Sequence, residues 1–250
     1  MNAIVNEKIV HPHFCDCVIE KGKLYAFDNR IGGVFEADLN DMSLSVLRVY
    51  DGNPVPFVKK FFIFSSFFVM QQSFTANIIV YDRKKSCFEI YKSDMPEDII
   101  YNAVPVDNAI VFIPFRWNGK IVVFDMRNRE YEILEIYNDG QIVSDDMVFR
   151  PDLSEEGRIV FSVGHGTFFY QLDIKNKKID SRKIIGESID IYIAKLDGNE
   201  IWTIEKGAGM LYGFGENKYR IEIPKAEYGN LCVLKDHICL LPAERGNIVI

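Results

Sequence analysis

The sequence lacks the features by which membrane-spanning and secreted proteins are recognised. None of its apolar runs approaches the roughly 18 residues that a transmembrane helix needs. The first ten residues mix Asn2, Asn6, Glu7 and Lys8 with apolar ones, unlike a signal peptide. The five cysteines are odd in number and show no paired spacing of the metal-knuckle type, which favours a reducing compartment. We therefore expect a cytoplasmic protein that contacts no membrane.

The sequence also has fewer basic than acidic residues. The chain has 29 Lys and Arg against 36 Asp and Glu, a net charge of -7, so its overall field repels phosphate backbones. This balance argues against a nucleic-acid partner. With 48% hydrophobic and 26% charged residues, the 250-residue chain is rich enough in apolar side chains to bury a core, which excludes disorder.

Sequence signatures of the common enzyme classes are missing as well. There is no Gly-x-Ser-x-Gly elbow, no glycine-rich phosphate loop before a helix and no His-Glu-x-x-His segment. We expect no cofactor. His165, between Gly164 and Gly166, is the one candidate for a general base, and an ordinary glycine-rich hairpin loop is the competing interpretation.

One pattern does recur along the chain. A short apolar segment ending in aspartate, followed by a polar turn, closes at Asp38, Asp82, Asp125 and Asp173, at intervals of 44, 43 and 48 residues. A weaker fifth copy ends in Gly215. Periods of 40 to 50 residues are typical of propeller blades. The aspartate itself is expected to bond the backbone of its own turn.

Each copy is flanked by further segments of strand type. In the third repeat, residues 101–105 and 109–113 precede the aspartate segment and residues 129–136 follow it with alternating polarity. β-Branched and aromatic residues bounded by Gly, Asn and Asp favour strands over helices. Four antiparallel strands per repeat predict the blade of a β-propeller.

The two ends of the chain complete this prediction. The last repeat supplies three strands, at residues 230–234, 238–241 and 247–250, and residues 3–10 form a strand that can pair beside Ile248. We therefore predict an all-β fold, a six-bladed β-propeller of four-stranded antiparallel blades in which the N-terminal strand completes the C-terminal blade. Closure of this kind removes exposed sheet edges. The single domain spans residues 1–250, with blades at roughly 14–50, 54–93, 99–137, 147–185, 190–223, and 228–250 plus 3–10.

In period and strand pattern the chain resembles the kelch-like and related propeller repeats. The Gly-Gly doublet of kelch repeats and the Gly-His pair of WD repeats do not recur, since Gly32-Gly33 and Gly164-His165 are single instances, and there is no Trp-Asp pair. The resemblance therefore implies the fold and a loop-bearing binding face, and no functional residue is carried over.

Loops between the second and third strands, with the blade-to-blade connections, would share one face of such a fold. Five of these six loops carry a residue that is or can be cationic, and an arginine offers a planar fork to carboxylates and phosphates. The competing interpretation is that these cations simply face water. Acidic residues in the blade-to-blade connections on the same face could neutralise them, so the ligand could also be a peptide or a sugar. The predicted ligand-binding residues are Arg30, Gln71, Gln72, Arg116, Trp117, His165, Lys206 and Arg245.

Two functions are compatible with this face. The favoured one is a non-catalytic module that binds a protein or peptide partner, or an acidic saccharide, on which Trp117 could stack. The alternative is an enzyme acting on an acidic sugar by proton transfer or elimination, with His165 as base and Arg116 and Arg245 holding the carboxylate. The oligomeric state is left open.

The remaining cysteines and histidines predict no metal site. His11, His13, Cys15 and Cys17 lie too far apart along an extended strand for all four to reach one ion. Cys15 and Cys17 are expected to be buried thiols on an inner strand. Cys232 and Cys239 flank a tight turn and would lie opposite each other in a hairpin, in either redox state.

Overall fold

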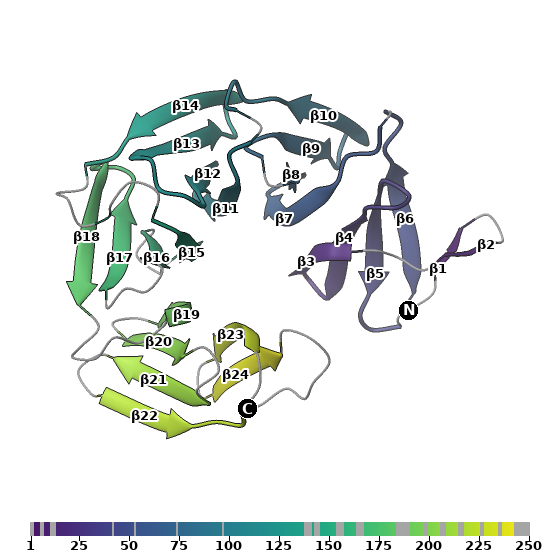
Figure 1. Cartoon of the computed structure of the whole chain (residues 1–250). Helices are drawn as coiled ribbons and strands as arrows, with labels where there is room; N and C mark the ends of the chain where they lie inside the picture. The colour runs from purple at the N-terminus through teal and green to yellow at the C-terminus, as the bar shows by residue number, and fades with distance from the viewer. Residues whose placement is uncertain are drawn as a thin grey trace. The chain divides into compact units, whose positions relative to one another are not determined.

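The structure, a computed structural model, consists of β-strands joined by turns (Figure 1). It describes residues 3–5, 8–10, 14–41, 43–52, 54–73, 75–96, 98–137, 142, 146–153, 158–163, 168–183, 191–197, 200–205, 209–214, 218–225, 228–234 and 237–242. Within these residues no helix has the length and apolar character to cross a bilayer.

The first of two compact units, Met1–Ala103, contains two four-stranded sheets whose strands pair antiparallel in chain order. We call each four-stranded sheet a blade and number the blades in chain order. Blade 1 consists of β3 (Phe14–Glu20), β4 (Lys23–Asp28), β5 (Gly33–Asp38) and β6 (Leu44–Val49). Blade 2 consists of β7 (Val58–Phe64), β8 (Phe67–Gln72), β9 (Ile78–Asp82) and β10 (Cys87–Tyr91).

The second unit, Val104–Ile250, repeats this arrangement. Blade 3 begins with β11 (Tyr101–Val106), which crosses the boundary between the two units, and continues with β12 (Ala109–Pro114), β13 (Lys120–Asp125) and β14 (Glu130–Glu135). Blade 4 consists of β15 (Val148–Leu153), β16 (Ile159–Val163), β17 (Phe168–Asp173) and β18 (Lys178–Lys183). Blade 5 consists of β19 (Ile191–Asp197), β20 (Glu200–Glu205), β21 (Met210–Phe214) and β22 (Lys218–Glu222), and a hairpin of β23 (Tyr228–Leu234) and β24 (His237–Pro242) follows. In this unit β15, β19 and β23 lie toward one side, and β18 and β22 toward the other (Figure 1).

The predicted all-β fold of four-stranded antiparallel repeats is confirmed. The β23–β24 hairpin has Cys232 opposite Cys239, as the sequence indicated. Residues 243–250 lie outside the described part of the chain, so the sixth blade and the closure of the ring stay predictions. The N-terminal segment differs from the expected single strand, because β1 (Ala3–Val5) pairs with β2 (Lys8–Val10) and Ala3 lies opposite Val10.

Burial decreases from the middle of a blade to its outer strand. Every residue of β9 and of β16 is buried, and every residue of β22 is exposed. A strand covered on both faces needs apolar side chains at consecutive positions, which explains runs such as Ile78–Tyr81 in β9. The outer strands β6, β10 and β14 are mostly exposed or half-buried, in keeping with their more polar sequences.

The recurring aspartate closes the turn after the third strand, as predicted. Asp82 Oδ1 accepts the backbone N–H groups of Lys84 and Lys85 at 2.9 and 3.1 Å. Asp125 Oδ1 accepts the N–H of Arg127 at 2.6 Å, and Asp173 Oδ1 accepts that of Asn176 at 2.9 Å. Backbone N–H donors stabilise the ionised carboxylate, so the pKa values of Asp82 and Asp173 lie below the usual aspartate value.

Blades 1 and 2 are joined by interlocked polar and aromatic side chains. Arg83, the residue after the blade 2 aspartate, reaches back to blade 1 and forms an ion pair with Glu20 at 2.8 Å. Its guanidinium lies over the rings of Phe68 and Tyr25, with its central carbon 4.6 and 5.1 Å from their centroids. It also donates to the Tyr25 hydroxyl at 3.3 Å. Charge and aromatic surface from both sheets therefore fill this seam.

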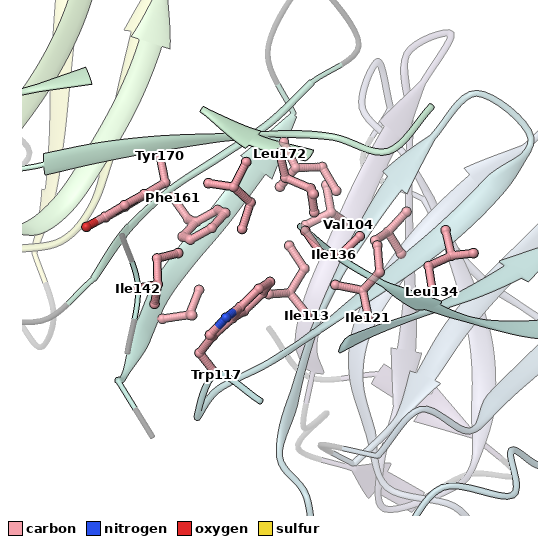
Figure 2. Close-up of a cluster of buried hydrophobic side chains, with 14 of the residues drawn as sticks. Val104, Ile113, Trp117, Ile121, Leu134, Ile136, Ile142, Phe161, Tyr170 and Leu172 are labelled. Atoms are coloured by element: carbon pink, nitrogen blue, oxygen red, sulfur yellow. The ribbon is translucent and has the colours of Figure 1, made fainter. Parts of the chain in front are cut away.

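Blades 3 and 4 share a continuous apolar core (Figure 2). Trp117 and Phe161 stack near its centre with ring centroids 6.3 Å apart. Backbone hydrogen bonds add to this packing at the outer strands, where the Tyr137 N–H donates to Lys177 O at 2.9 Å and the Ile179 N–H donates to Tyr137 O at 3.1 Å. The relative position of these two blades is therefore fixed by both packing and hydrogen bonds.

Candidate functional site

The loop between β4 and β5 is held in one conformation by Asp28. This side chain is fully buried, and its Oδ1 accepts the backbone N–H groups of Arg30 and Ile31 at 2.7 and 2.9 Å. The Gly32 N–H donates to Asp28 O at 2.8 Å, and Gly32 has a φ of +68°, which a glycine adopts without strain. The exposed side chain of Arg30 therefore projects from a preorganised backbone.

The same loop is bonded to the first residue of β7, at the end of the connection between blades 1 and 2. Asn29 donates from Nδ2 to Val58 O at 3.0 Å and accepts the Val58 N–H at 2.7 Å. Gly32 lies directly against Val55, since a Cβ on this glycine would come within 2.7 Å of the valine side chain. The connection presents Val55 and Phe57, which are 40% and 43% exposed. We call Arg30, Val55 and Phe57 the loop surface.

Of the two glutamines predicted as ligand contacts, Gln71 has a structural role for its side chain, whereas the hydrogen bonds described for Gln72 are those of its backbone. Gln71 is 1% exposed and donates from Nε2 to the carbonyl oxygens of Thr75 and Tyr101, both at 2.9 Å. Half-buried Gln72 donates its backbone N–H to Asn77 O at 2.9 Å and accepts the Thr75 hydroxyl on its carbonyl at 2.8 Å. Gln71 thus braces the start of β11 and is closed to a ligand, because its amide nitrogen is already used by two buried carbonyl groups.

In the second unit the structure separates Arg116 from Trp117. The side chain of Arg116 is exposed, and its backbone forms a bridge with Met147. Trp117 is 2% exposed and belongs to the shared core of blades 3 and 4 (Figure 2). The backbone N–H of Trp117 donates to Asp146 O at 2.8 Å, and the backbone N–H of Val148 donates to Phe115 O at 2.8 Å. These bonds fold the loop over the core, so the indole packs inward and offers no face for stacking.

Several other predicted residues lie outside the described part of the chain: His165, Lys206 and Arg245, and His11 and His13. Cys17 is exposed, which corrects the prediction of a buried thiol at that position. Within the described residues no three His, Cys, Asp or Glu side chains gather as metal ligands.

Val55 and Phe57 are the functional candidates that the sequence prediction missed. They alternate with Pro54 and Pro56 in a blade-to-blade connection. Pro54 and Pro56 have no backbone N–H to donate to a neighbouring strand, so this stretch is unlike the interior of a sheet. Apolar residues between them are therefore not expected to be core residues of a strand. Apolar residues between prolines in a connection were the available signal.

The chain matches no protein-family model and no curated protein. Its likeness is to solved structures. A virginiamycin B lyase from Staphylococcus aureus aligns over 92% of this chain and 77% of its own at 12% identity and a TM-score of 0.67. A streptogramin B lyase structure aligns over 92% and 76% at 13% identity and a TM-score of 0.67. The protein YCF48, bound to a D1 peptide, aligns over 92% and 76% at 11% identity and a TM-score of 0.68. These neighbours are β-propellers, so the likeness shows the fold of this chain.

Proposed function

We propose that the chain is a non-catalytic module that binds a protein or peptide partner on the face formed by its second-to-third-strand loops and blade-to-blade connections. The observation that carries this proposal is the loop surface, where two partly exposed apolar side chains and an exposed arginine come from two segments that the Asn29–Val58 hydrogen bonds and the Gly32–Val55 contact hold together. Arginine and aromatic residues are the types that dominate binding energy at protein interfaces. The peptide held by the propeller YCF48 supports binding of this kind in the fold.

The chemistry of the loop surface defines the partner. Arg30 would donate two hydrogen bonds to a carboxylate in a bidentate arrangement, and Val55 and Phe57 would cover an apolar side chain. A rigid surface loses little conformational entropy on binding, so a ligand with few contacts can still bind measurably. A short peptide segment meets this requirement. We therefore expect a peptide in which an acidic residue lies close to a large apolar one.

The test is a selection of peptides from a displayed random library on the whole chain. Enriched sequences are synthesised, and their dissociation constants are measured by fluorescence anisotropy. We expect Phe57→Ala and Arg30→Ala each to weaken binding by about tenfold or more. The matched controls are Ile90→Ala, an apolar side chain of similar exposure on β10, and Lys84→Ala, an exposed cation in the β9–β10 turn.

Two outcomes would contradict the proposal. If the library yields no saturable binder, the loop surface has no peptide-binding role. If the controls weaken binding as much as Phe57→Ala does, the peptide binds elsewhere.

The saccharide version of this function is less well supported, because its stacking residue, Trp117, is in the core. The enzymatic alternative depends on His165 and Arg245, which lie outside the described residues. Turnover of acidic sugars by the whole chain, abolished in His165→Ala, would favour that alternative.

A further inference from the structure

A cleft of about 590 Å³ opens between blades 3 and 4. It is lined by the turns after β11, β13 and β17, at the ends of the blade 3 strands opposite to the loop that carries Arg116. Its floor is aliphatic and consists of the half-buried Ala109, Val123 and Ile174 together with the buried Val106 and Val111. Val123 and Ile174 also pack on the shared core, so the floor is an extension of that core.

The cleft exists because this seam has small residues where the first unit has large ones. Ile174 follows the blade 4 aspartate, and the residue at the same position of blade 2 is Arg83, which fills the seam with blade 1. Val111 pairs with Val123, two residues before Asp125, and Tyr25 pairs with Glu36, two residues before Asp38. Val111 in blade 3 and Tyr25 in blade 1 are therefore at equivalent positions. Tyr25 stacks under Arg83, whereas the shorter Val111 and Ile174 leave the space between their blades open.

The walls of the cleft are fixed before any ligand arrives. The Tyr137 hydrogen bonds to Lys177 and Ile179 join the outer strands of the two blades, and the Val148 and Trp117 N–H groups join them at the loop end. Collapse of the cleft would require these bonds to break. A ligand therefore finds a preformed apolar floor, as is usual for small-molecule sites.

The polar groups at the rim leave two cations available. Asp125 and Asp173 accept hydrogen bonds from their own turns, and Arg158 Nε lies 4.0 Å from Asp173 Oδ2. Arg127 and Lys175 are exposed, line the cleft, and make no ion pair in the described part of the chain. Three carboxylates, of Asp107, Asp125 and Asp173, and three cations, of Arg127, Arg158 and Lys175, line the cleft, and Arg127 and Lys175 are the two of these cations that lie outside an ion pair in the described residues.

We propose that this cleft binds a small amphipathic carboxylate. The apolar body of the ligand covers the Val and Ile floor, and its carboxylate accepts charge-assisted hydrogen bonds from Arg127 and Lys175. A volume of about 590 Å³ is within the range of small-molecule sites. The site uses none of the residues of the loop surface and is independent of the function proposed above.

The test uses hydrocinnamate as the probe and hydrocinnamyl alcohol, which has the same apolar body without the charge, as its matched control. Binding to the whole chain is followed by ligand-observed NMR, and the dissociation constants are compared. We expect saturable binding of hydrocinnamate and binding of the alcohol that is weaker by about tenfold, the value of one charge-assisted hydrogen bond.

Two pairs of variants locate the site. Arg127→Gln should weaken hydrocinnamate binding by about tenfold, and Lys84→Gln, at the same turn position of blade 2, should leave it unchanged. Ile174→Phe fills the cleft and should abolish binding of both probes, whereas Leu39→Phe, at the same position of blade 1, should not. Circular dichroism and thermal melting show whether each variant is folded.

Three results would overturn the proposal. The alcohol binding as tightly as the acid would mean that the rim cations do not recognise a carboxylate. Binding that survives both Arg127→Gln and Ile174→Phe in folded protein would place the ligand elsewhere. Failure of hydrocinnamate to bind saturably at a level of about 10 mM, ten times a dissociation constant of about 1 mM, would show that the cleft is not a site for this class.

Discussion

Removing the Arg83 side chain should loosen the seam between blades 1 and 2. Arg83 is one of the residues through which the second blade contacts the first, by an ion pair with Glu20 at 2.8 Å and by stacking on Tyr25, while its guanidinium also lies over Phe68 of its own blade. The side chains of the ion pair are 28% and 27% exposed, so solvent screens part of their attraction. Arg83→Ala removes the charge and the guanidinium plane together.

The expected loss can be worked out from these contacts. A partly screened ion pair contributes about 1 kcal/mol to the free energy of unfolding. Cation–π contacts at such sites contribute about 0.5 kcal/mol each, which adds about 1 kcal/mol for the two rings. Arg83→Ala should therefore destabilise the protein by about 2 kcal/mol. Arg83→Met keeps the apolar stem of the side chain and should lose less.

Urea unfolding followed by circular dichroism measures these differences, and thermal melting should show a shift of about 5 °C for Arg83→Ala. Lys84→Ala is the control, because Lys84 is exposed and adjacent in sequence, and it should change stability by less than about 0.5 kcal/mol. If Arg83→Ala costs no more than Lys84→Ala, Arg83 does not hold the two blades together.

Three further changes have expected outcomes. Trp117→Ala should destabilise by about 3 to 5 kcal/mol in urea unfolding, because a fully buried indole leaves a cavity; a change under about 1 kcal/mol would place the indole outside the core. Gln71→Met should cost about 2 kcal/mol in the same assay, because it removes two hydrogen bonds to the Thr75 and Tyr101 carbonyl groups; a neutral effect would contradict the bracing role. The lowered pKa of Asp82 means that its turn hydrogen bonds stabilise the fold above the unfolded aspartate pKa of about 4 and are lost as the pH falls below that value. Asp82→Asn should therefore make the melting temperature fall less between about pH 5 and pH 2. A pH profile identical to that of the unchanged protein would refute this.

The strands were predictable because their signal is local. Runs such as Ile78–Tyr81 are apolar at consecutive positions, and only a strand buried on both faces uses such a pattern over so few residues. The turns were predictable for the same reason, since an aspartate that bonds the N–H groups two and three residues on needs no distant partner. The period of 43 to 48 residues then fixed the number of strands in each repeat.

The direction of loop side chains was not predictable, because distant backbone sets it. The loop position of Trp117 suggested exposure, but hydrogen bonds to Asp146 and from Val148 press that loop onto the core. Gln71 lies near the end of β8, where polar residues usually face solvent, yet its amide donates to the Tyr101 carbonyl 30 residues later in the chain. The partners Asp146, Val148 and Tyr101 cannot be recognised from the residues next to Trp117 or Gln71 in sequence.

The two seams show how the same strand pattern can be closed or open. Arg83 and Ile174 each follow the recurring aspartate of their blade and lie at the seam with the preceding blade, where Arg83 contacts Glu20 and Ile174 lines the cleft. Strand pairing and the aspartate turn are the same in both blades, so this position is not needed to form the blade. A long, charged residue there adds stability, and a short aliphatic one leaves a lined space between blades. Repeats of this kind can therefore gain or lose a binding cleft through one or two substitutions without a change of fold.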